Sequence, residues 1–82
     1  MRTTNEDIIC RFFLALDALY ASGEIERYAH FEREAGIPHS AIYHLRKNIS
    51  RHIMRPQWLA FMVDRYGVSA DWLLLGRGRM FM

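Results

Sequence analysis

Four glycines divide this chain into short segments of helical character. In the segment before Gly23, apolar residues recur at steps of three and four, which places them on one face of an α-helix. Gly36, Gly67 and Gly76 close the later segments in the same way. Glycine readily takes the left-handed conformation that ends a helix just beyond its last turn. The pattern predicts several short helices and no strands.

Capping residues and prolines indicate where these helices begin. Thr3-x-x-Glu6 matches a capping box, in which side chains at the two positions accept each other's backbone N–H groups. Pro38 and Pro56 suit a first helical turn, and Ser69 is a natural N-cap. The expected helices span about 4–22 (opening at Thr3 or Thr4), 25–35, 38–48, 56–66 and 69–75.

The length of the chain fits one small domain, expected over residues 1–82 with a short apolar tail at 79–82. Because 51% of the residues are hydrophobic, the chain can form a core, so it is neither a disordered tail nor a charged linker. We expect no membrane association, since no apolar run reaches the length of a membrane span. The first seven residues do not resemble a signal peptide. We therefore expect a cytoplasmic protein.

The net charge of +2 hides a strong asymmetry along the chain. Residues 1–36 carry a net charge of −3, and residues 37–82 carry +5. No acidic residue occurs between Glu34 and Asp64, where a polyanion would meet attraction without local repulsion. Lys47 is the only lysine, and arginine, the dominant cation, suits phosphate and guanine edges well. The alternative interpretation is an ordinary solvated helix face.

Residues that could support catalysis or bind a metal are scarce. The four histidines lack the spacing of metal ligands, and Cys10 stands alone on an apolar pattern where we expect it to be buried. Ser40 and His44 lie one helical turn apart, but no carboxylate is near them in the sequence to orient the imidazole. Residues 76–78 read as a helix stop, because a dinucleotide-binding loop follows a strand. We expect no enzyme, no cofactor and no metal.

The segment FEREAGIPHSAIYHLRKN (31–48) has the spacing of a helix-turn-helix, two short helices joined by a tight turn containing glycine. Its apolar residues are expected to face inward: Phe31, Ile37, Ile42 and Leu45. Four polar side chains then remain on the outer face, where they could hydrogen-bond to base edges in a major groove: His39, Ser40, Tyr43 and His44. The alternative is that they are merely exposed, as on any surface helix.

The string GVSADWLLLG (67–76) strongly resembles the closing signature of the Cro and phage-repressor (XRE-type) helix-turn-helix family. The resemblance implies an all-α, compact five-helix bundle of the lambda-repressor-like type. Its helix-turn-helix would span about 26–48, with a recognition helix at about 38–48 in the major groove. His39, Ser40 and His44 match the family's base-reading positions. The positions matching its phosphate contacts are Arg27 or Tyr28, Lys47, and Arg55 with Gln57.

Two features depart from the family's pattern. Where relatives usually have alanine four residues before the turn glycine, this chain has Glu32, which we expect to turn outward or to hold the two helices apart. The connection from Lys47 to Pro56 is also longer. Arg51 and His52 therefore have no counterpart in the family, and their phosphate contacts are assigned on charge alone. Arg46 is expected to contribute to the salt-dependent affinity together with Lys47, Arg51 and Arg55.

These observations predict a repressor-like transcriptional regulator that binds double-stranded DNA sequence-specifically as a homodimer, and so lies at the nucleoid when bound. Met80, Phe81 and Met82 look too apolar for a free tail, so we expect them to bury a partner surface. The alternative is a protein-interaction or antitoxin-like module that uses the same fold, with its last helix and tail as the contact surface.

Overall fold

The first helix of the fold is α1 (Asn5–Ala21). The computed structural model describes residues 3–50 and 54–82. The capping box at the start of α1 joins Thr4 and Asp7: the Thr4 hydroxyl oxygen accepts from Asp7 N at 3.1 Å, and the Asp7 carboxylate accepts from Thr4 N at 3.0 Å. The expected box from Thr3 to Glu6 is therefore wrong by one residue. The Thr3 hydroxyl accepts instead from Arg11 Nη2 at 2.6 Å.

Helix α2 (Tyr28–Ala35) begins three residues later than its sequence predicts. Ile25 is buried in the core and its N–H donates to Leu19 O at 3.3 Å, so the preceding chain is held against the end of α1. Arg27, the N-cap of α2, has an extended backbone. Burial of the Ile25 side chain in the core thus moves the start of α2 from Ile25 to Tyr28.

Helix α3 (Ala41–Lys47) also begins three residues late, because Pro38 lies in the turn and not in the helix. Pro38 O accepts from Ala41 N at 3.1 Å, and Ser40 has a left-handed backbone with φ of 68°. Ser40 is the one non-glycine residue with positive φ in the described ranges. Such a conformation is rare for residues with a side chain and must be held by its surroundings.

Helices α4 (Pro56–Tyr66) and α5 (Ala70–Leu75) follow their predicted starts and ends. Pro56 lies in the first turn of α4, and the Ser69 hydroxyl accepts from Trp72 N at 3.3 Å at the start of α5. With five helices and no strand in residues 3–50 and 54–82, the predicted all-α class is confirmed.

The core gathers around aromatic rings from three helices. Phe12 of α1 and Phe61 of α4 both pack edge-on against Phe31 of α2, with ring centroids 5.8 and 5.4 Å apart. The residues expected to face inward from 31–48 are all buried: Phe31, Ile37, Ile42 and Leu45. Cys10, in contrast, is exposed, so the expectation that it is buried is wrong. It shares the outer face of α1 with Leu14 and Asp17, at steps of four and three.

The C-terminal tail folds back on its own chain. Met80 O accepts from Ser69 N at 2.8 Å, Met82 N donates to Gly67 O at 3.0 Å, and Phe81 forms an isolated bridge with Val68. Met80 packs partly buried against the core of its own chain. That the tail buries a partner surface stays a prediction. Phe81 and Met82 remain 37% and 83% exposed.

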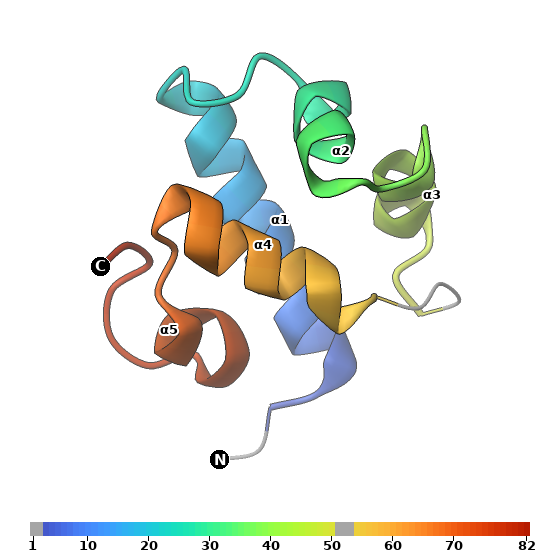
Figure 1. The fold of residues 1–82 in the computed structure, drawn as a ribbon. Helices are drawn as coiled ribbons and strands as arrows, with labels where there is room; N and C mark the ends of the chain where they lie inside the picture. The colour runs from blue at the N-terminus through green and yellow to red at the C-terminus, as the bar shows by residue number, and fades with distance from the viewer. Residues whose placement is uncertain (1–2, 51–53) are drawn as a thin grey trace.

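The arrangement of the helices gives the molecule two separate ends. In Figure 1, α2 and α3 lie together on one side, while α5 and the C-terminus lie on the other. The two surfaces expected to contact partners therefore point away from each other. None of the described helices is long and apolar enough to cross a membrane.

Candidate nucleic-acid interface

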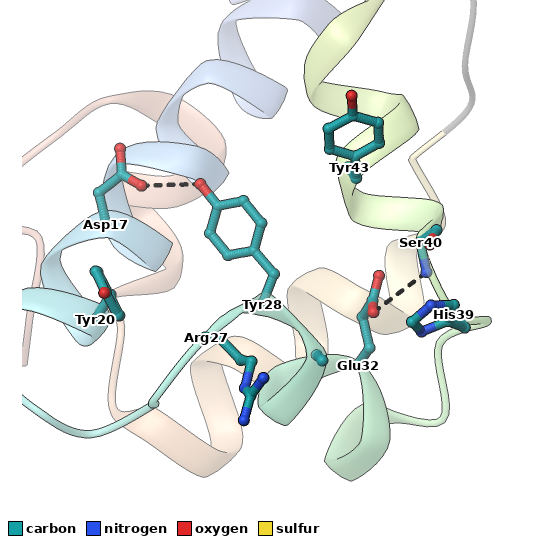
Figure 2. A pocket seen from close by; sticks show the side chains of 9 residues that line it. Asp17, Tyr20, Arg27, Tyr28, Glu32, His39, Ser40 and Tyr43 are labelled. Atoms are coloured by element: carbon teal, nitrogen blue, oxygen red, sulfur yellow. Dashed lines mark hydrogen bonds between the residues drawn. The ribbon is translucent and has the colours of Figure 1, made fainter.

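The start of α3 is held by a buried carboxylate from α2. Glu32 is only 5% exposed, and its Oε2 accepts from Ile42 N at 3.1 Å while its Oε1 accepts from Ser40 N at 3.4 Å. Figure 2 shows the Glu32 side chain pointing from α2 toward this turn. The first N–H groups of a helix lack partners within it, and they carry a partial positive charge that favours an anion. Glu32 thus joins the two helices, and the expectation that it turns outward is wrong. The alternative, that it holds the two helices apart, stays a prediction.

The outer face of α3 presents polar and cationic side chains. His39, Tyr43 and His44 are exposed, and the Tyr43 and His44 rings lie edge to face with centroids 5.4 Å apart. Lys47 Nζ lies 5.5 Å from the centre of the Tyr43 ring. Ser40 is half-buried at the start of the helix. The structure therefore brings the four predicted base-reading residues to one end of the molecule, with Lys47 beside them.

A cleft of about 580 Å³ separates α3 from the end of α1 and the start of α2 (Figure 2). It gathers five of the predicted site residues: Arg27, Tyr28, His39, Ser40 and Tyr43. Four other residues complete its lining: Asp17, Tyr20, Ala29 and Glu32. Tyr20 and Tyr43 are exposed on opposite walls, so the cleft has an aromatic lining that continues onto the face of α3.

Arg46 is engaged within the protein. Its guanidinium donates to both carboxylate oxygens of Asp17, at 3.1 and 3.0 Å, and lies over the Phe13 and Tyr28 rings. The Tyr28 hydroxyl also donates to Asp17, at 3.0 Å. Phosphate contacts by Arg46 and Tyr28 stay predictions, and a phosphate would compete with Asp17 for both donors.

The other predicted phosphate-contacting residues of the described chain lie at the ends of three helices. Arg27 is the exposed N-cap of α2, and Arg55 is the exposed N-cap of α4, with Gln57 exposed in its first turn. Lys47 ends α3. Arg51 and His52 lie outside the described residues, so their predicted contacts remain predictions.

Three polar residues of the cleft were not predicted as site residues from the sequence: Asp17, Tyr20 and Glu32. Of these, only the role of Glu32 could have been predicted from nearby sequence. A carboxylate one residue after the buried Phe31 and shortly before a helix can accept hydrogen bonds from the first N–H groups of that helix. Asp17 and Tyr20 lie on α1, eleven and eight residues before Tyr28, the first cleft residue in α2. Their proximity depends on how α1 packs.

A second cluster fixes α2 against α4. The Tyr66 hydroxyl of α4 donates to Glu34 of α2, and Arg65 and His30 approach the same carboxylate at 3.8 and 3.6 Å. The hydrogen bond from Tyr66 lowers the pKa of Glu34 below its ordinary value of 4.5. Burial, as the larger cause, and the hydrogen bond to Glu34, as the second, raise the pKa of Tyr66 to about 12. These contacts hold α2, and hence the carboxylate of Glu32, in place.

No group of three or more His, Cys, Asp or Glu side chains in the described part of the chain could hold a metal ion. Comparisons with protein-family models, with curated proteins and with solved structures find no match to this chain. The candidate interface therefore stands on its own geometry.

Proposed function

We propose that this chain is a sequence-specific, double-stranded DNA-binding transcriptional regulator of repressor-like type, in which α2 and α3 form a helix-turn-helix and α3 is the recognition helix. One observation carries the proposal: the exposed face of α3 is polar and cationic. His39, Tyr43 and His44 can hydrogen-bond to base edges, and Lys47 can contact a phosphate.

Charge supports the same assignment. The sequence has no acidic residue between Glu34 and Asp64, so α3 and the start of α4 carry none. The two carboxylates in the adjoining cleft have partners within the protein: Asp17 binds Arg46, and Glu32 binds backbone N–H groups. A phosphate backbone approaching this end would meet compensated acids and exposed arginines.

Size supports binding as a homodimer. One such domain reads only a few base pairs, and two domains about 34 Å apart can read a two-fold symmetric site on one face of the duplex. The exposed leucines of α5, Leu74 and Leu75, offer an apolar surface. Figure 1 places α5 itself on the side of the molecule away from α3. We assign the dimer contact to this surface.

Selection from a random duplex library, followed by sequencing, tests the function, the symmetry and the half-site spacing together. Fluorescence anisotropy on the recovered duplex should then show affinity that falls steeply with salt, by about 0.9 log units per log unit of salt for each phosphate contacted. No binding to any duplex at low salt would refute the proposal.

The exposed α5 surface also favours a second candidate, a protein-interaction or antitoxin-like module of the same fold. This candidate predicts a partner that covers Leu74, Leu75 and Phe81 while α3 stays free. Substitution of α3 residues then leaves partner binding unchanged, whereas in a DNA-binding regulator the same substitutions weaken duplex binding.

A further inference from the structure

We propose, on the basis of the proposed DNA-binding function, that Glu32 is a positioning residue of the interface: its buried carboxylate fixes the start of α3 and thereby the orientation of the base-reading face. Glu32 would touch no base. It would act through the backbone N–H groups of Ser40 and Ile42, from which it accepts hydrogen bonds at 3.4 and 3.1 Å.

Helix α3 needs such support because it provides no cap of its own. It has only seven residues, fewer than a helix needs to be stable in isolation. Ser40, at its N-cap, makes no side-chain capping hydrogen bond and has a left-handed backbone. Ala41 N donates to Pro38 O within the turn, but Ile42 N finds its acceptor on another element, and that acceptor is Glu32.

The buried contacts of α3 alone would define its position less sharply. Ile42 and Leu45 hold the helix to the core through apolar packing, which is not directional. The two hydrogen bonds that Glu32 accepts are directional: one is donated by Ser40 N, and the other by Ile42 N, one residue before Tyr43. With only 5% of Glu32 exposed, most water is excluded from its carboxylate, so solvent cannot easily replace it as the acceptor.

The sign of the effect on DNA binding separates positioning from simple charge. Loss of a negative charge near a polyanion should by itself strengthen binding. Glu26→Gln, at an exposed site just before α2, measures that charge effect and should leave affinity unchanged or slightly increased. If Glu32 positions α3, Glu32→Ala should bind the selected duplex about tenfold more weakly, as expected for a lost charged hydrogen bond.

Glu32→Gln provides the graded test, since its amide retains one acceptor oxygen for Ile42 N while its NH₂ group cannot accept from Ser40 N. Its affinity should lie between those of the wild type and Glu32→Ala. The preference for the selected duplex over a scrambled one should fall in the same order. Amide hydrogen exchange at Ile42 should be fast in Glu32→Ala and protected in Glu32→Gln.

All variants are compared at a temperature where circular dichroism shows each to be folded, and Glu32→Gln decides the question if Glu32→Ala does not fold. Leu59→Ala in α4 provides a destabilised control that should keep its duplex preference. Absence of duplex binding by the wild type overturns the proposed function itself. Wild-type binding together with Glu32 variants that behave like Glu26→Gln overturns the positioning role alone.

Discussion

At the residue scale, three carboxylates accept hydrogen bonds from polar groups of neighbouring helices. Glu32 satisfies the start of α3, Asp17 binds Arg46 and Tyr28, and Glu34 binds Tyr66. Each carboxylate links its own helix to at least one other, so a residue that the sequence suggests is acidic surface has a structural role in the fold. Net charge along the sequence therefore overstates how repulsive the acidic first part is to a polyanion.

The pair of Asp17 and Arg46 predicts opposite effects on stability and binding. Asp17→Asn should lower the free energy of unfolding by only about 0.5 kcal/mol, because both side chains are about half exposed. The same substitution removes a negative charge from the cleft and releases Arg46, so affinity for duplex DNA should rise at low salt. Urea unfolding and fluorescence anisotropy measure the two effects. A weaker affinity in Asp17→Asn would show that Arg46 must stay bound to Asp17.

Tyr66 predicts a loss of stability at alkaline pH. Its pKa is raised to about 12 from an ordinary value of 10.0, so the folded state favours the protonated hydroxyl. The resulting stabilisation is fully present below pH 10 and is lost as the pH rises toward 12. Tyr66→Phe should remove this alkaline loss of stability. It should also remove the last step of the tyrosinate absorbance titration, which is the ionisation at the highest pH, and it should raise the pKa of Glu34. Tyr20→Phe, at an exposed tyrosine, is the matched control; a last step that survives in Tyr66→Phe would contradict the assignment.

At the element scale, local signals were sufficient where a helix end depends on its own residues. Pro56 and Ser69 begin α4 and α5, as the sequence predicts. The starts of α2 and α3 were predicted three residues early, because they depend on contacts distant in sequence. Ile25 is buried in the core, and its N–H donates to Leu19 O. Ser40 has a left-handed backbone and donates its N–H to Glu32, and the local sequence around a serine does not predict this conformation.

Helix α5 depends on a side chain from the other end of the chain. Arg11 of α1 donates to Leu73 O at 2.8 Å and to Leu74 O at 3.1 Å, carbonyls in the last turn that have no partner within so short a helix. Arg11→Ala should lower the free energy of unfolding by about 1.5 kcal/mol, as expected for hydrogen bonds from a charged donor. Urea unfolding measures the change, with the exposed Arg33→Ala as control. Equal effects of both substitutions would show that α5 does not need this cap.

At the scale of the whole molecule, the sequence predicted the residues of the candidate site better than their arrangement. His39, Tyr43 and His44 are exposed together because the 3.6-residue period fixes which face of α3 is buried. The cleft could not be predicted, since Tyr20 reaches it only through the packing of α1. The tail illustrates the same limit, because Met80 finds its apolar contacts within its own chain.

The separation of α3 from α5 makes dimerisation and DNA contact independently testable. If α5 carries the dimer contact, a charge at Leu75, which is 50% exposed, should disrupt association without disturbing α3. Leu75→Asp should therefore sediment as a monomer and lose cooperative binding to a two-half-site duplex, while still binding a single half-site. Leu14→Asp, at a leucine of α1 that is 54% exposed, introduces the same charge on another face and should remain dimeric. Because a monomer must bind both half-sites independently, the loss should be largest at low protein concentration. A Leu75→Asp protein that remains dimeric would place the two-fold contact elsewhere on the surface.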